Sequence, residues 1–152
     1  MKHKLFREQQ LHCDIRTAWE FFSAPGNLSK ITPKDMNFVV RTKFETNEIY
    51  EGMLIDYFVS PLFGIKMKWK TEITQVDFRK SFTDYQKEGP YKLWNHHHEF
   101  IENEHGVLMK DTVDYELPLG FLGDIAHKLF VKNKLKHIFD YRYKVLEKYF
   151  NQ

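Results

Sequence analysis

The stretch IKMKWKTEI, residues 65–73, contains the pattern that decides the fold. Apolar and charged side chains alternate along it, with Ile65, Met67, Trp69 and Ile73 interleaved with Lys66, Lys68, Lys70 and Glu72. A period of two residues is typical of a β-strand, whose successive side chains point to opposite faces. The stretch therefore predicts an antiparallel strand with one face in a core and the other in water.

Strand character recurs on both sides of this stretch. Six more segments have it, at residues 4–12, 37–44, 53–60, 81–88, 91–102 and 107–117. Turn residues such as Gly89-Pro90 separate neighbouring segments. We expect one antiparallel sheet of about seven strands.

Helical patterns interrupt and end this run of strands. Asp14 is a candidate N-cap for a helix that Pro25-Gly26 ends, and the stretch NLSKITP at 27–33 predicts a second short helix. After Pro118 an apolar stripe at helical spacing predicts a helix over 122–150, formed by Leu122, Ile125, Ala126, Leu129, Ile138, Val145, Leu146 and Tyr149.

A helix of that length spans roughly 43 Å, which is enough to cover the buried face of the sheet. The sequence thus predicts a single α+β domain over residues 1–152. A long helix across a curved sheet seldom fills the concavity completely, so we expect a ligand cavity between them.

Composition narrows the classes of function. Hydrophobic residues make up 42% of the chain and aromatic residues 16%, an aromatic share suited to the walls of an apolar cavity. The formal net charge of +2 argues against nucleic acid as a partner. A single cysteine, Cys13, excludes an internal disulfide framework and a cysteine-rich zinc site. The N-terminal stretch has no apolar signal region, so we expect a cytoplasmic protein without integral membrane segments.

Five stretches carry a resemblance to a known superfamily. They are AWEFFSAPGNLSKITP at 18–33, MKWKTEI at 67–73, GPYKLWNHHHEF at 89–100, DTVDYELPLG at 111–120 and IFDYRY at 138–143. The chain resembles the START-like, or SRPBCC, superfamily (Bet v 1-like, with the helix-grip fold), and within it the bacterial polyketide cyclase/dehydrase and lipid-transport domains. The resemblance implies a strongly curved sheet wrapped around a long C-terminal helix, with two short helices after the first strand. It also implies a cavity for a hydrophobic or amphipathic molecule, and it brings no catalytic set.

Three consecutive histidines lie in the stretch LWNHHHEF, residues 93–100. Strand alternation places His96 and His98 on the face of Trp94 and Phe100, and sends His97 to the opposite face. We therefore expect two of the three histidines to point inward.

The next strand predicts a carboxylate on the same inner face. Asp111 alternates with Met109 and Tyr115, and a buried carboxylate needs a hydrogen-bond donor. The hairpin between the two strands makes His96 or His98 the expected partner. The predicted ligand-binding set is Trp69, Trp94, His96, His98, Phe100, Met109, Asp111 and Tyr115.

These residues leave several functions open. We favour binding, transport or sequestration of a hydrophobic or amphipathic small molecule. One alternative is a cyclase/dehydrase acting on a polyketide-like substrate through His96 or His98 with Asp111. Another is a regulatory module that binds a partner protein.

A metal site is the least favoured interpretation. Two histidines at positions i and i+2 lie about 6.5–7 Å apart along a strand and can share one zinc ion. Asp111 is a candidate third ligand, but no third inward histidine is evident, so we expect no metal and no cofactor. Lysines on the C-terminal helix indicate a solvated face, although transient contact with a membrane surface stays open. The sequence does not indicate the oligomeric state.

Overall fold

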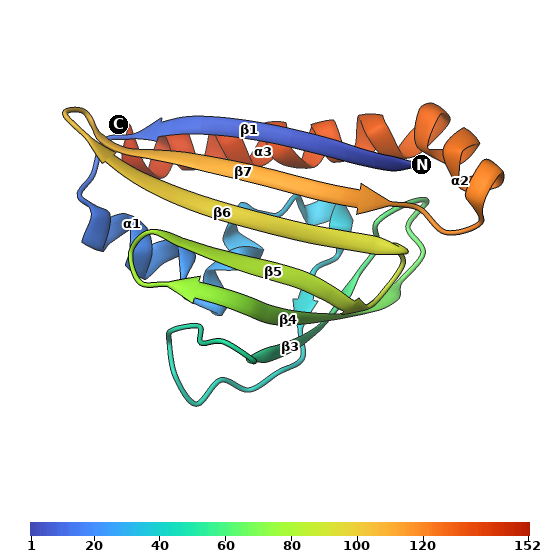
Figure 1. The fold of residues 1–152 in the computed structure, drawn as a ribbon, viewed down its shortest axis with the longest axis horizontal. Coiled ribbons are helices and arrows are strands. Elements are labelled where there is room, and N and C mark those ends of the chain that lie inside the picture. Colours follow the sequence, from blue (N-terminus) through green and yellow to red (C-terminus); the bar gives the residue numbers. More distant parts are fainter.

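A single antiparallel sheet forms one layer of the molecule (Figure 1). The computed structural model describes all residues 1–152. The seven strands are ordered β1-β7-β6-β5-β4-β3-β2 across the sheet, which confirms the predicted number. Their bounds are Lys2–Leu11 (β1), Val39–Val40 (β2), Leu54–Val59 (β3), Met67–Asp77 (β4), Ser81–Glu88 (β5), Leu93–Asn103 (β6) and Gly106–Glu116 (β7).

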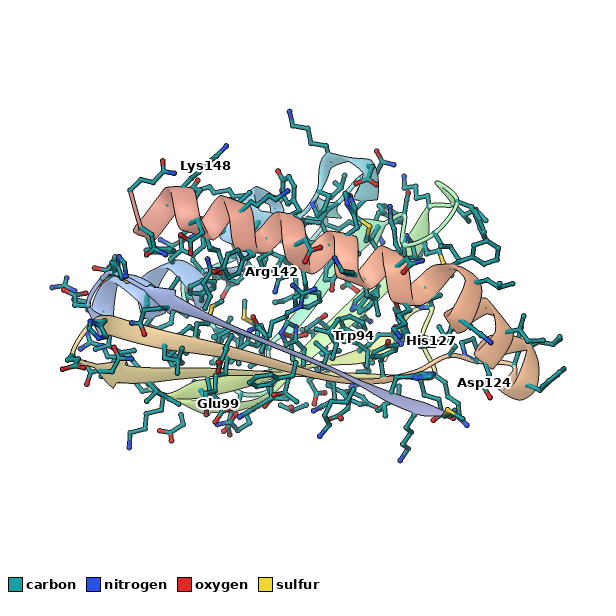
Figure 2. All side chains as sticks on the ribbon, turned by 90° about the horizontal axis from the view of Figure 1, so that it is seen from above. Trp94, Glu99, Asp124, His127, Arg142 and Lys148 are labelled. Atoms are coloured by element: carbon teal, nitrogen blue, oxygen red, sulfur yellow. The ribbon has the colours of Figure 1, made fainter.

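Helices form the second layer. The N-terminal group comprises α1 (Ile15–Phe22) and two 3-10 helices, η1 (Pro25–Ile31) and η2 (Lys34–Met36). The C-terminal group comprises α2 (Gly120–Ala126), the π-helical turn η3 (His127–Val131) and α3 (Lys132–Phe150). Figure 2 shows α3 above the sheet, with side chains filling most of the space between the two layers. The arrangement is the α+β helix-grip fold that the sequence predicts.

Local chemistry explains where α1 begins. The carboxylate of Asp14 accepts a hydrogen bond from the Thr17 backbone amide at 2.7 Å, which satisfies one of the free amides of the first turn. Trp19, on the same helix, is almost fully buried, and its indole N–H donates to Glu48 at 3.0 Å. The predicted N-cap is therefore correct, and α1 is anchored to the core by its tryptophan.

The predicted strand 37–44 is much shorter in the structure. Only Val39 and Val40 pair with β3 as strand β2. Further along, a side chain takes the place of a backbone hydrogen bond, because the hydroxyl oxygen of Thr42 accepts from the Asp56 backbone amide at 2.7 Å. In the opposite sense, β4 continues four residues beyond the predicted end, to Asp77.

The buried face of the C-terminal helix also differs from the prediction. Leu122, Ile125 and Leu129 are exposed, whereas Val131, Leu135, Phe139 and Leu146 are buried against the sheet. The turn η3 is π-helical and takes more residues per turn than an α-helix, so it rotates the face that follows it. An apolar stripe drawn with a single helical period across η3 therefore assigns the wrong face to the residues before that turn.

No helix of the chain has both the length and the apolar character that crossing a membrane requires.

The core divides into two apolar clusters. One contains Trp19, Phe82 and Phe100, and the other contains Trp69 and Trp94. Along β6 the two clusters are separated by His96 and His98, which belong to neither. The fold thus places a polar group in the middle of an apolar interior.

Candidate functional site

A cavity of about 530 Å³ lies between the sheet and α3. Small-molecule sites occupy about 300–1,000 Å³, so the cavity is large enough for a ligand. Most residues lining it are hydrophobic, and they come from β3, β4 and β6, from the segment around η1 and from α3. The sheet contributes the polar lining residues Thr71, Asp84, His96, His98 and Asp111, and α3 contributes Lys134 and Arg142.

Five of the eight sequence-predicted residues line this cavity, namely Trp69, Trp94, His96, His98 and Asp111. The other three, Phe100, Met109 and Tyr115, are buried but lie outside its lining. Phe100 and Met109 are paired across β6 and β7 and belong to the cluster around Trp19. The Tyr115 hydroxyl lies 2.7 Å from Nε2 of His127, away from the cavity. An inward direction on a strand therefore does not by itself bring a side chain to the cavity wall.

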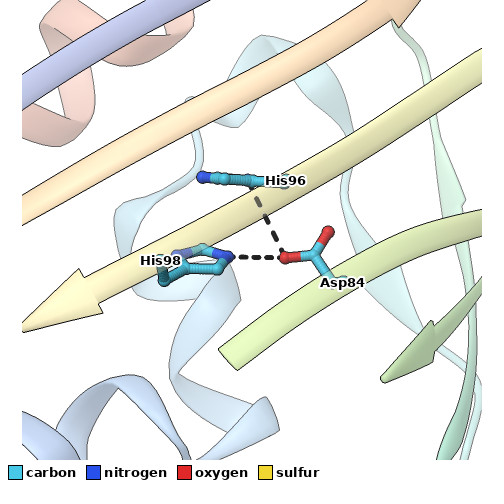
Figure 3. Close-up of side chains that lie close together, drawn as sticks. All are labelled: Asp84, His96 and His98. Atoms are coloured by element: carbon cyan, nitrogen blue, oxygen red, sulfur yellow. Dashed lines mark hydrogen bonds and ion pairs between the residues drawn. The ribbon is translucent and has the colours of Figure 1, made fainter. Parts of the chain in front are cut away.

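The two inward histidines and two aspartates form one polar cluster, which we call the His–Asp cluster (Asp84, His96, His98 and Asp111). Nε2 of His96 lies 2.7 Å from Oδ1 of Asp111, and Nδ1 of His98 lies 3.1 Å from the same oxygen. On the other side, Nε2 of His98 lies 2.6 Å from Oδ2 of Asp84 and Nδ1 of His96 lies 3.8 Å from it (Figure 3). The imidazole rings are stacked, with centroids 3.7 Å apart.

Strand register explains why these groups meet. His98 is directly opposite Asp111 on β7, and His96 is directly opposite Asp84 on β5. Because side chains two residues apart share a face, each aspartate reaches both histidines. Asp111 was predicted to contact His96 or His98, and it contacts both.

Sequence reasoning missed Asp84. It alternates with the buried residues Phe82 and Gln86 on β5, and that period of two is the signal that places it inward.

Sequence reasoning also missed Arg142, which lies on the buried face of α3 between Phe139 and Leu146. Figure 2 shows it between α3 and the sheet. Its guanidinium carbon is 4.9 Å from the centroid of the Phe139 ring. Its Nε is buried without a hydrogen-bond partner. Arg142 is thus a cation in the cavity wall with an unused hydrogen-bond donor.

Burial and neighbouring charges set the protonation of the His–Asp cluster. Burial would raise the pKa of Asp111, but hydrogen bonds from His96 and His98 outweigh it and hold that pKa far below its usual value. For Asp84, burial is likewise outweighed by the charges of both histidines and the hydrogen bond from His98, so its pKa is lowered. Both aspartates are carboxylates at neutral pH.

The two histidines differ in their protonation. Burial and then the charge of His98 lower the pKa of His96. Burial also acts to lower the pKa of His98, but the two aspartates outweigh it and raise that pKa. His98 is therefore the histidine of the pair that keeps its proton to the higher pH, and the cluster can exchange a proton or a hydrogen bond with a molecule in the cavity.

Exposed apolar side chains mark the opening of the cavity. Phe63, Leu119 and Leu122 belong to its lining although they are 68%, 77% and 62% exposed. Phe63 also contacts Phe130 of η3, with ring centroids 5.0 Å apart. The opening therefore lies between the loop that follows β3 and the start of α2.

Solved structures of other proteins share this architecture. A major latex-like protein from ginseng, Panax ginseng, aligns over 99% of this chain and 98% of its own, with a TM-score of 0.69 and 18% identity. A protein from Chromobacterium violaceum aligns over 99% of both chains, with a TM-score of 0.70 and 10% identity. A protein from Thermus thermophilus aligns over 97% of this chain and 95% of its own, with a TM-score of 0.63 and 16% identity.

These similarities establish the Bet v 1-like, helix-grip fold for the chain. At such low identity they carry no functional residue over to it. No protein-family profile matches the sequence, and no curated protein matches it.

Proposed function

We propose that the chain binds an amphipathic small molecule, with the apolar part in the cavity and the polar end at the His–Asp cluster and Arg142. The observation that supports this most directly is the cavity itself. In an open cavity of about 530 Å³ with a mostly apolar lining, the wall atoms face water and lack apolar contacts, which is unfavourable. An apolar ligand supplies those contacts.

Arg142 supports an anionic or hydrogen-bond-accepting polar end. A guanidinium whose Nε is buried and unpaired favours a carboxylate, sulfonate or similar acceptor. Asp84 and Asp111 already accept hydrogen bonds from the histidines, so they leave the guanidinium available. The proposed ligand is therefore an apolar acid or a molecule with a carbonyl at one end.

A matched pair of variants on β3 tests the proposal. Ile55 lines the cavity, while its neighbour Leu54 points away and is exposed. The indole of Ile55→Trp would fill cavity space, whereas Leu54→Trp adds the same side chain in solvent. We expect native mass spectrometry of protein purified from cell extracts to show a bound small molecule on the unmodified chain and on Leu54→Trp, and not on Ile55→Trp. A bare mass for the unmodified chain in every extract would contradict the proposal.

Chemical transformation of the ligand is the second candidate function. It is favoured by the 2.7 Å contact between His96 and Asp111, since a carboxylate that orients an imidazole is a common device in general acid–base catalysis. A cyclase/dehydrase reaction of this kind predicts that His96→Gln lowers turnover far more than it lowers ligand affinity. Recovery of the bound molecule unchanged after prolonged incubation would contradict this candidate and leave the binding function in place.

A further inference from the structure

Three potential metal ligands converge at the wall of the cavity. They are Nδ1 of His96, Nε2 of His98 and a carboxylate oxygen of Asp84, and all lie within 4.8 Å of one another. In Figure 3 the dashed lines from the two rings meet at the same oxygen of Asp84. The other ring nitrogen of each histidine faces Asp111 instead.

Asp111 has the position of a supporting carboxylate. Histidines that bind metals usually donate their second ring N–H to a carboxylate or carbonyl, which fixes the tautomer and aims the free lone pair at the ion. Here a single oxygen of a buried aspartate, 2% exposed, lies 2.7 Å from Nε2 of His96 and 3.1 Å from Nδ1 of His98. One residue of β7 thus orients both rings toward Asp84 on β5.

This orientation brings electron pairs of three groups together. When both rings donate to Asp111, the nitrogens that remain and the Asp84 carboxylate all present lone pairs to the same small space. Three such groups repel one another unless a cation lies between them. A proton between His98 and Asp84 meets this need in part, and a divalent metal ion would satisfy all three groups and neutralise the two carboxylates.

We propose that Asp84, His96 and His98 bind a divalent transition-metal ion of the zinc or ferrous type, with Asp111 as the positioning residue. Imidazole nitrogen with one carboxylate suits these ions better than magnesium or calcium, which prefer oxygen alone. The proposal does not rest on the ligand proposed above.

Metal binding requires the side chains to adjust, because the two imidazole rings are stacked at an interplanar angle of 24° and their planes must tilt toward a common point. Ligand atoms around a tetrahedral zinc ion stand about 3.4 Å apart, given bonds of about 2.0–2.2 Å. Oδ2 of Asp84 is 2.6 Å from one nitrogen and 3.8 Å from the other, so a sideways shift brings both distances toward this value. The three protein ligands leave at least one coordination position, and the cavity that they line gives a small molecule access to it.

Zn²⁺ and Co²⁺ are the probes for the experiment. Protein stripped with a chelator is titrated with Zn²⁺ by calorimetry, and with Co²⁺ by visible absorption. We expect one ion per chain and a visible band of four- or five-coordinate Co²⁺. Asp84→Asn should weaken binding at least tenfold, and Asp111→Asn about 10–100-fold with the stoichiometry kept. His97→Gln is the matched control, because His97 sits between the two ligands in β6 but faces the other way, with Nδ1 2.7 Å from the Thr83 hydroxyl.

Histidine ring NMR of the unmodified chain keeps the test independent of variant folding. Zn²⁺ is expected to shift the resonances of Nδ1 in His96 and Nε2 in His98 and to leave those of His105 and His12 in place. Binding at surface histidines alone, affinity that is unchanged in Asp84→Asn, or no saturable binding to the unmodified chain would each overturn the proposal.

Discussion

Asp111→Asn measures how strongly the His–Asp cluster depends on one buried charge. The Asp111 carboxylate is 2% exposed and contacts a nitrogen of both histidines. Asparagine keeps the shape and one oxygen acceptor but removes the negative charge that both histidine rings face. The substitution thus isolates the electrostatic contribution of Asp111.

The size of the effect follows from the burial. Removing one partner of a buried ion pair costs about 3–5 kcal/mol, because the other charge is left uncompensated in the interior. Since asparagine still accepts one hydrogen bond, we expect a loss near the lower end, about 3 kcal/mol of unfolding free energy. The assay is urea denaturation followed by circular dichroism, in the presence of a chelator so that metal binding does not contribute.

Asp114→Asn is the matched control on the same strand. Asp114 faces solvent and pairs with Lys4 at 3.6 Å, and exposed pairs of this kind contribute about 0–1 kcal/mol. We expect the control to change the unfolding free energy by less than about 1 kcal/mol. Equal losses for the two variants would refute the view that Asp111 is the electrostatic centre of the cluster.

Three other predictions address the ligand, the pH dependence and the backbone. Arg142→Met should weaken binding of the anionic dye 1-anilinonaphthalene-8-sulfonate about tenfold or more, since a hydrogen bond to a charged group contributes about 1.5–3 kcal/mol. The uncharged analogue N-phenyl-1-naphthylamine should bind both proteins alike, and an equal loss for the two dyes would remove Arg142 as the anion contact. Burial and the charge of His3 lower the pKa of His127. As pH falls, His127 therefore becomes protonated in the unfolded chain before it does in the folded chain. The unfolding free energy of the unmodified chain, relative to that of His127→Gln, should therefore decrease as pH falls through about 6.5. Urea titrations at pH 7.5 and at pH 5.5 measure it, and a larger relative value at pH 5.5 would contradict this sign. Gly106 has φ of 124°, and an added Cβ would stand 2.3 Å from the Leu11 carbonyl oxygen. Gly106→Ala should thus lower the melting temperature by several degrees, whereas Gly26→Ala, with open space around it, should not; equal melting temperatures for the two variants would exclude the clash.

The sequence carries enough information for the sheet and for the direction of the central histidines. A period of two fixes which face a side chain occupies, so the inward direction of His96, His98 and Asp111 could be predicted without a structure. It does not fix the register between strands, and only the register brings Asp84 opposite His96. The same period of two places Asp84 inward on β5, but its contact with both histidines follows only from the register.

The local sequence pattern does not show which inward side chains reach the cavity, or which face of α3 is buried. Phe100 and Met109 face inward but pack against the cluster of Trp19, because the cavity does not extend along the whole sheet. Arg142 lies on the buried face of α3, whose phase is set after the π-helical turn η3. A single helical period drawn from Leu122 does not cross that turn, so the cation in the cavity wall could not be placed from the sequence.

The measurement that tests the central claim most directly is a fluorescence titration with N-phenyl-1-naphthylamine. The dye is uncharged, so its binding reports the apolar cavity without a contribution from Arg142 or the His–Asp cluster. We predict saturable binding of one dye per chain to the unmodified protein and to Leu54→Trp, and loss of that binding in a folded Ile55→Trp. Undiminished one-to-one binding to Ile55→Trp would show that the dye binds elsewhere and would contradict the internal site.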